Sequence, residues 1–397
     1  MSKLEEPTNE TSAMQKEISA IAEQGGGRAT KVEQLIQQYC PDGVEYKPLG
    51  EVCDIHKGVQ FNKTDMKEEG SYPVINGGIN PSGYVEVFNE EKETITISQG
   101  GASAGYVNFI MTRFWLGAHC YAVKPTQQVL NRYLYHFVKQ NERTLQQCQY
   151  GAGIPALAKA TIINLSIPVP PLPVQEEIVR ILDTFAELQA ELQAELQKRL
   201  QQYNYYRDNL LSFEGRTDVE WKKLGDVADL GTGSHNTQDG LVEGQYPFYT
   251  RGSEILYLND YDYDETAIIT AGDGAGVGKV FHFVQGKYAL HQRAYRIVPN
   301  EKIMLARFVY YYIGATFYNY IMKSSVSSSV VSIRKPMMVN YPIPIPPLAE
   351  QKRIVDILDR FSTLTTDITA GLPAEIEARR KQYEYYRDQL LTFKQKA

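Results

Sequence analysis

The segment IPVPPLPVQEEIVRILDTF (residues 167–185) recurs later in the chain as IPIPPLAEQKRIVDILDRF (residues 343–361), with 12 of 19 positions identical. A second block, QQYNYYRDNLLSF (residues 201–213), recurs as KQYEYYRDQLLTF (residues 381–393), with 9 of 13 positions identical. Two matched blocks in the same order indicate an internal duplication. The chain is therefore predicted to contain two copies of one structural design.

Each copy is predicted to contain a long amphipathic helix. The proline strings SIPVPPLP and YPIPIPP cannot continue a helix, so they predict an extended strap before it. The first helix has apolar residues at spacings of three and four, which predicts a stripe for a partner helix: Ile178, Ile181, Phe185, Leu188, Leu192, Leu196, Leu200, Tyr203, Tyr206 and Leu210. The second helix repeats the stripe but contains Gly371 and Pro373, which are expected to break or kink it.

The regions in front of the helices match more faintly. SQGGASAGYV (residues 98–107) aligns with AGDGAGVGKV (residues 271–280), and His119 aligns with His291. Short β-branched and aromatic runs predict strands, and helices are expected near residues 131–147 and 303–323. The predicted fold class is α+β, with two globular mixed α/β domains in an inverted pseudo-twofold arrangement, separated by two long antiparallel helices that form a coiled coil. The expected segments are a leader with a short helix (1–43), a first domain (44–170), a central helix (171–213), a second domain (214–342) and a distal helix (343–397).

Length and composition set the broad class. The 397 residues, 43% hydrophobic and 22% charged, are typical of a soluble globular protein with two domains. The four cysteines form no CxxC pair, which argues against zinc sites and a disulfide framework. Residues 1–30 are polar and acidic, unlike a signal peptide or membrane anchor. We therefore expect a cytoplasmic protein with a weakly ordered leader.

The net charge of −6 is unfavourable for binding nucleic acid, because lysine and arginine supply much of the affinity for phosphate. The acidic excess lies mainly in the leader and the central helix, however, and residues 44–170 and 215–342 each have a net charge of zero. These domains are still able to carry local basic faces. DNA binding by the isolated chain is expected to be weak, which implies a basic partner.

The sequence motifs do not predict catalysis or metal binding by this chain. AGDGAGVGKV departs from a phosphate-binding loop, which requires glycine where Asp273 stands and serine or threonine where Val280 stands. Both glycine-rich stretches are predicted to be turns between strands. Asn80-Pro-Ser-Gly differs from the Asn-Pro-Pro-aromatic motif of amino-methyltransferases, and His119 and His291 are expected to be buried structural histidines.

Candidate DNA contacts are polar side chains in predicted turns. The donors of arginine match guanine, and the amides of asparagine and glutamine match adenine. The candidates for base contact are Gln60, Asn62 and Lys63 in the first domain, and His235, Asn236, Gln238 and Arg251 in the second. Lys159, Arg334 and Lys335 are expected at phosphates. Each of these residues also fits an ordinary solvated position in a loop.

The motifs Ile-Pro-x-Pro-Pro-Leu-x-x-Gln, Ile-Val-x-Ile-Leu-Asp-x-Phe and Gln-Tyr-x-Tyr-Tyr-Arg-Asp-x-Leu-Leu-x-Phe occur twice behind divergent domains. This combination resembles the specificity subunits of type I restriction-modification enzymes, especially members with tandem four-residue units in the central helix. The resemblance implies a non-catalytic subunit in which each domain recognises one half of a bipartite, asymmetric double-stranded DNA target. It also implies two methyltransferase subunits docked on the helices, which perform adenine-N6 methylation, and restriction/translocase subunits bound through them.

The resemblance further implies where cofactors and contacts lie. No cofactor is expected on this chain, and S-adenosylmethionine, Mg²⁺ and ATP are expected on the partner subunits. The segments before the straps are commonly at the DNA in this family, which implicates Gly151, Gly153, Ile154, Ser327 and Ser328. The residues expected to bind partners are Ile178, Phe185, Leu192, Tyr206, Arg207, Ile354, Phe361, Tyr386 and Arg387.

Two alternatives stay open on the sequence. A tandem protein- or glycan-binding module with a coiled-coil spacer has the same pattern of divergent domains and shared helices. A nucleotide hydrolase using residues 272–279 predicts ATP turnover that Lys279→Ala abolishes.

The units LQAE, LQAE and LQKR, starting at Leu188, lie in the spacer. Adding or removing one unit is expected to change the gap between half-sites and not the half-sites themselves.

Overall fold

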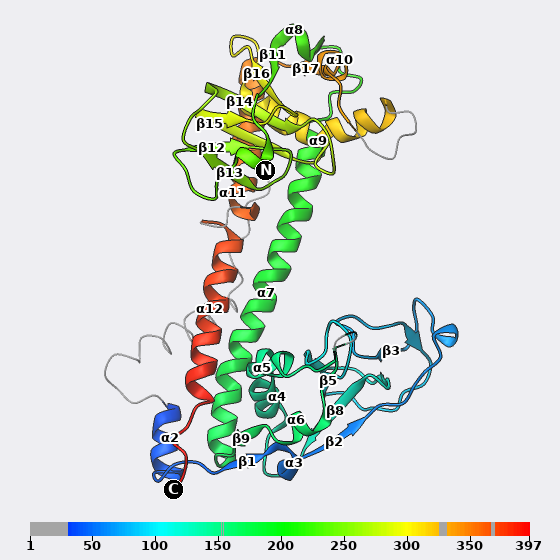
Figure 1. Ribbon diagram of the computed structural model, residues 1–397, viewed down its shortest axis with the longest axis vertical. Helices are drawn as coiled ribbons and strands as arrows, with labels where there is room; N and C mark the ends of the chain where they lie inside the picture. Colours follow the sequence, from blue (N-terminus) through cyan, green and yellow to red (C-terminus); the bar gives the residue numbers. More distant parts are fainter. Residues whose placement is uncertain (1–30, 152, 154, 325–331, 367–369) are drawn as a thin grey trace. The chain divides into compact units, whose positions relative to one another are not determined.

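The computed structural model describes residues 31–151, 153, 155–324, 332–366 and 370–397 (Figure 1). The chain divides into two compact units, Met1–Gln193 with Ile376–Ala397, and Ala194–Glu375. The division falls inside the helix α7 (Leu172–Leu210), so each unit contains one globular domain and part of this helix. The predicted leader, residues 1–30, lies outside the described residues. Within the described part of the chain, no helix is long and apolar enough to cross a membrane.

Both proline straps are extended, as predicted, because each pairs with a strand at the start of its domain. In the first unit β9 (Ser166–Pro168) pairs antiparallel with β1 (Tyr46–Pro48), and in the second β17 (Pro342–Ile345) pairs antiparallel with β10 (Glu220–Lys223). The predicted break in the second long helix is confirmed by the bounds of two separate helices, α11 (Leu348–Thr366) and α12 (Leu372–Leu390). Pro373 falls in the first turn of α12, where its missing N–H costs no helical hydrogen bond.

The first domain is built on a four-stranded sheet with strand order β2-β8-β5-β6 and a three-stranded sheet with order β4-β3-β7. All five residues of β5, Thr-Ile-Thr-Ile-Ser, are buried. The strands are β2 (Cys53–Lys57), β3 (Tyr72–Ile75), β4 (Tyr84–Val85), β5 (Thr94–Ser98), β6 (Val107–Ile110), β7 (Trp115–Leu116) and β8 (Cys120–Pro125). The helices are α3 (Leu49–Val52), the short η2 (Lys63–Asp65), α4 (Asn131–Gln140), α5 (Glu142–Gln147) and α6 (Lys159–Ile163), with α2 (Lys31–Tyr39) preceding the domain.

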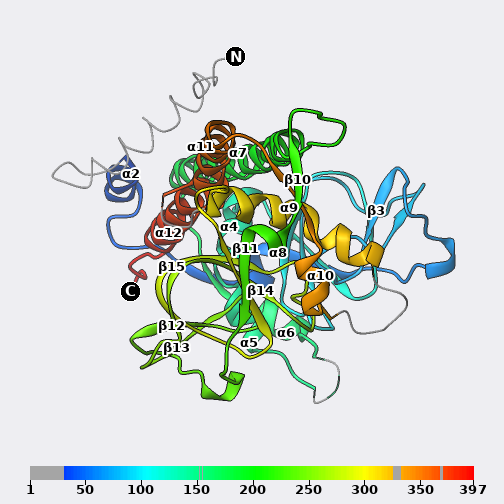
Figure 2. The same ribbon diagram turned by 90° about the horizontal axis from the view of Figure 1, so that it is seen from above.

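In the second domain one six-stranded sheet, with strand order β11-β16-β14-β15-β12-β13, takes the place of the two sheets. Figure 2 shows β11, β14, β15, β12 and β13 of this sheet. The strands are β11 (Ala228–Thr232), β12 (Tyr246–Tyr249), β13 (Ile255–Leu258), β14 (Tyr263–Ala271), β15 (Phe281–Leu290) and β16 (Ala294–Pro299). The helices are α8 (Leu224–Val227), the short η3 (Thr237–Asp239), α9 (Ala306–Ser324) and α10 (Lys335–Val339). The order β11-β16-β14-β15 repeats β2-β8-β5-β6, and the parallel pair β12/β15 repeats β3/β7. The predicted mixed α+β domains are confirmed.

Each unit packs a segment of α7 against a segment of the second long helix. In the first unit Phe185 stacks on Tyr386, and in the second Tyr206 stacks on Phe361; the ring centroids are 5.5 Å apart in both cases. Phe185 and Phe361 are equivalent positions of the repeat, and so are Tyr206 and Tyr386. Each unit therefore pairs the phenylalanine of one copy with the tyrosine of the other. The apolar stripe predicted on α7 is therefore used for helix packing within the chain.

The packing is antiparallel within each unit, as predicted. In the first unit the Tyr46 hydroxyl donates to the carbonyl of Phe393 at 3.0 Å, which brings the residues after α12 to β1 and so to the strap before α7. In the second unit Leu211 and Phe213, directly after α7, share a buried core with Ile343 of the strap before α11. In each unit one helical segment thus ends where the other begins.

A buried glutamine near the start of each helix joins the helix, the strap and the domain. Gln175 is fully buried; its Oε1 accepts from the N–H of Leu130 at 2.8 Å, and its Nε2 donates to the carbonyls of Gln128 and Pro170 at 2.9 and 2.7 Å. Gln351 makes the same three bonds in the second unit at 2.8 to 3.0 Å. Buried amides need such partners, so these two residues fix how each domain sits on its helix segment.

A polar cluster adds to this attachment in the first unit. His136 of α4 is fully buried; its Nε2 donates to Oδ1 of Asp183 on α7 at 2.8 Å, and its Nδ1 accepts from the Tyr383 hydroxyl at 3.2 Å. Burial lowers the pKa of His136 despite the carboxylate beside it, so the imidazole is neutral at pH 7. Arg132 donates to the same carboxylate. The matching residues of the second unit are Arg307, Tyr311 and Asp359.

Candidate nucleic-acid interface

Four loop segments of the second domain meet through backbone hydrogen bonds, and a fifth joins them through the ion pair of Arg251 with Asp273; we call the five segments the loop cluster. The N–H of Gln292 donates to the carbonyl of His235 at 2.9 Å, the N–H of Gly272 to the carbonyl of Arg293 at 2.8 Å, and the N–H of Ile333 to the carbonyl of Gly272 at 2.7 Å. The cluster comprises residues 233–240 after β11, 250–254 after β12, 272–280 between β14 and β15, 291–293 before β16, and 332–334 before α10.

Three of the predicted base-contacting residues lie together in this cluster. Asn236, Gln238 and Arg251 line a cavity of about 290 Å³, which Thr237, His291, Gln292 and Arg293 complete. Asn236 and Gln238 are exposed. The backbone of Asn236 is fixed by its N–H, which donates to Asp239 at 2.6 Å in a capping box of η3. These side chains therefore sit on a defined frame at the surface.

His235, the fourth predicted base-contacting residue, faces another way. It does not line the cavity; its Nε2 lies 3.3 Å from Oδ1 of Asp262, and its ring packs edge-on against Phe248 with centroids 5.7 Å apart. The side chain is 29% exposed. His235 thus anchors the loop after β11 to the domain more than it presents a group to a ligand.

The cavity borders a carboxylate held between two arginines. Asp273 Oδ1 accepts from Nη1 of Arg251 at 2.9 Å, and Oδ2 accepts from Nη1 of Arg293 at 3.0 Å. Burial alone would raise the pKa of Asp273, but the two arginines outweigh it and lower that pKa, so the carboxylate stays charged at neutral pH. Asp273 and Arg293 were not predicted as site residues, because 20 residues separate them and only strand pairing brings them together.

The glycine-rich stretch between β14 and β15 is a turn between antiparallel strands, as predicted. No helix follows it, whereas phosphate-binding loops place the anion at a helix N-terminus. Its glycines instead allow a close approach to neighbouring backbone. A Cβ on Gly272 would lie 2.6 Å from the carbonyl oxygen of Arg293, and one on Gly276 would lie 2.4 Å from that of Arg251. Only glycine lets the turn approach both arginine backbones.

The predicted phosphate contacts lie at the N-termini of two equivalent short helices. Lys159 begins α6 and Lys335 begins α10, and Arg334 is the residue before α10; all three are exposed. The N–H of Ile333, next to Arg334, donates to the carbonyl of Gly272, so Arg334 lies in the loop cluster and Lys335 directly follows it. Ser327 and Ser328 lie outside the described residues.

In the first domain the predicted contacts form two separate groups. Gln60, Asn62 and Lys63 are exposed in the loop after β2, where Gln60 Nε2 donates to the Phe61 carbonyl at 2.9 Å and Asn62 Nδ2 donates to Asp65 at 3.4 Å. The exposed Gly151, with φ +106°, and the exposed Gly153 precede α6. Ile154 lies outside the described residues. Within the described part of the first domain, no hydrogen bond joins these two groups.

The predicted equivalence of His119 and His291 is wrong. Ser98 pairs with Cys120 in the first domain as Ala271 pairs with Ala294 in the second, which sets His119 opposite the position of Arg293. The backbone agrees, because the carbonyl of His119 accepts from Gln99 at 2.8 Å as that of Arg293 accepts from Gly272. His291 is buried, as expected, but His119 is exposed. The two histidines were matched because they are the same residue type, and the strand register shows that they occupy different positions.

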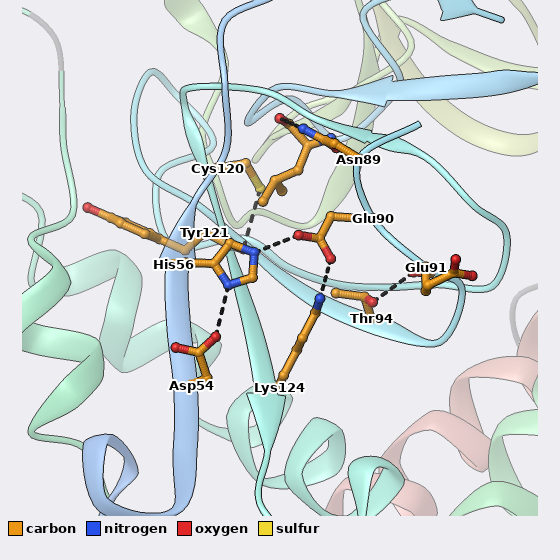
Figure 3. A network of polar contacts seen from close by, with 10 residues as sticks. Asp54, His56, Asn89, Glu90, Glu91, Thr94, Cys120, Tyr121 and Lys124 are labelled. Carbon is orange, nitrogen blue, oxygen red and sulfur yellow. Dashed lines mark hydrogen bonds and ion pairs between the residues drawn. The ribbon is translucent and has the colours of Figure 1, made fainter. Parts of the chain in front are cut away.

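A buried carboxylate braces the sheet of the first domain (Figure 3). Glu90 is buried; it accepts from Nε2 of His56 at 2.5 Å and lies 2.6 Å from Nζ of Lys124, so the loop before β5 is tied to β2 and β8. Asp54 lies 3.3 Å from the other ring nitrogen of His56. No group of three or more acidic, histidine or cysteine residues in the described ranges is placed to hold a metal ion. The ammonium of Lys124 and the imidazole of His56 thus give the buried carboxylate of Glu90 its polar partners.

Four of the nine predicted partner-binding residues point inward. Ile178, Phe185, Leu192 and Ile354 are buried within their own units and offer no surface to a partner, which corrects the prediction for these four. The error arose because an amphipathic stripe shows that a face is covered but not by what. The others are half-buried or at the edge of exposure: Tyr206, Arg207, Phe361, Tyr386 and Arg387.

The same helices carry a more exposed pair of tyrosines, which belongs to the repeated tyrosine clusters expected at helix packing and partner surface but is not among the partner-binding residues named above. Tyr205 is 67% exposed and Tyr385 is 62% exposed, at matching positions of the repeat. Each packs edge-on against the next tyrosine of its helix, with centroids 5.6 and 5.5 Å apart. Both copies of the YYRD motif keep this first tyrosine although it is exposed and helix packing does not require it. The repetition of the motif is therefore the feature of the sequence that points to these two residues.

Comparison with known proteins gives consistent matches over most of the chain. The family model of the type I restriction modification DNA specificity domain matches residues 41–202 and again 217–378. The chain is 32% identical over 379 residues to a protein of Haemophilus influenzae named as a type I restriction enzyme specificity subunit, covering 88% of this chain and 96% of that one. It is 32% identical over 393 residues to the EcoR124I/EcoR124II specificity subunit of Escherichia coli, covering 88% and 94%. The S subunit of a type I restriction-modification system from M. genitalium shares the fold, with a TM-score of 0.62 at 18% identity over 88% of this chain and 95% of that one.

Proposed function

The chain belongs to the family of type I restriction-modification specificity subunits, and from this premise we propose how it divides the work of recognising DNA. Each domain binds one half of a bipartite, asymmetric target in double-stranded DNA. The second domain does so through the loop cluster, and the first through the equivalent loops. Methylation of adenine and restriction are then carried out by partner subunits in the cytoplasm.

One observation carries this proposal: the two domains share a backbone frame but present different side chains on it. The N–H of Leu157 donates to the carbonyl of Gln99 in the first domain, and the N–H of Ile333 donates to the carbonyl of Gly272 in the second, both at 2.7 Å. On this common frame, Arg293 of the second domain is replaced by His119 in the first. Two readers of unlike sequences need such a combination, because hydrogen-bonding side chains in the groove specify bases.

The repeated helices support docking of two copies of one partner. Tyr205 and Tyr385 are large, exposed aromatic side chains in the same local geometry, and tyrosine is frequent among residues that dominate binding energy at protein interfaces. We therefore place one methyltransferase subunit at each YYRD motif, with Tyr205 or Tyr385 as its anchor and Arg207 or Arg387 beside it. The partners would bring S-adenosylmethionine and, through the restriction subunits, Mg²⁺ and ATP.

Sequencing of methylated bases tests the proposed function directly. The full chain is expressed with its methyltransferase subunit in a host free of adenine methylation. The expected result is one bipartite motif, methylated in both halves, that is lost when this gene is omitted. An unmethylated genome despite an assembled complex would contradict the proposal and favour a tandem protein- or glycan-binding module.

The docking sites are tested by stoichiometry. Tyr205→Ala or Tyr385→Ala is expected to leave one methyltransferase subunit per chain, and the double variant none, as measured by the mass of the purified complex. Gln201→Ala, a change at an exposed position of the same helix, serves as the control. Two bound subunits on the double variant would refute the assignment of these tyrosines.

A further inference from the structure

We propose that Arg293, held in place by Asp273, which Arg251 also binds, recognises a guanine in the half-site bound by the second domain. The inference rests on the proposed function and names one base contact within it. Arg293 is the most exposed of the three residues, with 62% of its side chain accessible, compared with 40% for Arg251 and 22% for Asp273. It is the member of the group that is placed to meet a ligand.

The guanidinium of Arg293 is oriented with one edge left for a base. Its Nη1 donates to Asp273, and among the described residues no other hydrogen bond of this guanidinium is found. The edge formed by Nε and Nη2 therefore remains available. Guanine presents two adjacent acceptors, N7 and O6, in the major groove, and a guanidinium edge donates to both at once. Adenine, cytosine and thymine do not present this pair of acceptors.

The backbone below Arg293 is fixed at both of its polar groups. Its N–H donates to Nδ1 of the buried His291 at 2.9 Å, and its carbonyl accepts from Gly272 at 2.8 Å. Burial lowers the pKa of His291, so the ring is neutral and Nδ1 is able to accept this bond. Side-chain and main-chain constraints together reduce the freedom that Arg293 would lose on binding, which is the general route to a selective contact.

The first domain shows that this arrangement is not part of the shared scaffold. Strand register places Gly100 at the position of Asp273, and the isolated bridges Gly100 to Ala156 and Asp273 to Ser332 agree with this. His119 stands at the position of Arg293. The frame is kept while the charged residues are absent, so stability of the fold does not require them. They are a property of the half-site that the second domain recognises.

The test uses the full chain in complex with its methyltransferase subunits and sequences the methylated bases of Arg293→Ala, Arg293→Lys and Asp273→Asn. Arg293→Lys keeps the charge but removes the two-pronged edge. We expect both Arg293 variants to lose, by roughly ten- to a hundredfold, the preference for guanine at one position of one half-site. Asp273→Asn should weaken the same preference by a smaller factor, because it loosens the arginine without removing it.

Arg216→Ala is the matched control. Arg216 is an exposed arginine of the same unit, paired with Asp218 at 2.6 Å and lying over Phe213, with no contact to the loop cluster. It should leave the motif unchanged. A motif that keeps its strict guanine in the Arg293 variants overturns the inference. A uniform loss of methylation at all targets, with preference intact, identifies a phosphate contact and overturns it equally. Absence of any motif with the unaltered chain contradicts the proposed function instead.

Discussion

Deleting one LQAE unit, residues 188–191, is expected to shorten the gap between the two half-sites by one or two base pairs. α7 is helical throughout this stretch, so the deletion removes about 6 Å of helix at 1.5 Å per residue. It also removes a rotation of about 400°, that is, one full turn and about 40°. One base-pair step spans about 3.4 Å and, at 10 to 10.5 pairs per turn, about 35°. The rotation of about 40° matches that of one base-pair step, and the shortening of about 6 Å matches the length of nearly two steps.

The local packing should survive this change, because the unit is repeated. After deletion, Leu192 takes the place of Leu188. Both residues are buried leucines, and both are followed by Gln-Ala-Glu. Phe185, which stacks on Tyr386, keeps its own neighbours up to Glu187. The deletion lies in a helix and leaves all loop residues in place, so both half-sites should be retained.

Sequencing of methylated bases in a strain that carries the shortened chain measures both quantities at once. Glu191→Ala, at an exposed position of the same stretch, changes composition but not length and should leave the gap unchanged. If the complex assembles and methylates but the gap is the same, α7 does not set the distance. If a half-site changes, the helix takes part in recognition, and the separation between spacer and readers is refuted.

Three further predictions concern the scaffold. Gln175→Leu removes three hydrogen bonds to backbone groups, one of them buried and two part-buried, and should lower the free energy of unfolding by about 1 to 3 kcal/mol in denaturant titrations, whereas the exposed Gln201→Leu should have little effect. Because burial lowers the pKa of His136, the unfolded chain binds the proton more readily, so stability present above pH 6.5 should fall as the pH drops below it; His136→Tyr, which copies the second unit, should reduce this dependence between pH 7.5 and 5.5, and the part due to His282 and His291, whose pKa values burial also lowers, should remain. Gly272→Ala should cost about 1 to 3 kcal/mol by crowding a backbone carbonyl, while Gly252→Ala, with no atom nearer than 3.9 Å, should be neutral in the same thermal unfolding assay.

Local rules were sufficient for the scaffold. Proline cannot continue a helix, so the straps were predictable, and Gly371 with Pro373 predicted the break between α11 and α12. The periodicity of apolar residues gave the long helices. The repeated YYRD and Pro-rich blocks gave the duplication and the resemblance to a family, because identity over separated blocks does not depend on knowing the fold.

Local rules were not sufficient for the site. Arg251, Asp273 and Arg293 are separated by about 20 residues each, and no spacing in the sequence marks them as a group. They meet because β14 pairs with β16 in one register and because Gly272 and Gly276 allow a close approach of the turn. The misplaced match of His119 with His291 has the same origin, since a shift of two positions is invisible without the hydrogen-bond ladder.

The sequence by itself determined that this protein has two copies of one scaffold, that long helices connect them, and that its family recognises DNA. Tertiary structure alone decided which side chains share a surface. It turned the apolar stripe of α7 inward, left Tyr205 and Tyr385 exposed, and placed Arg293 against Asp273. The physical reason is that helix and turn formation depend on neighbours in the chain, whereas a binding surface depends on contacts between distant residues, which strand register and packing set.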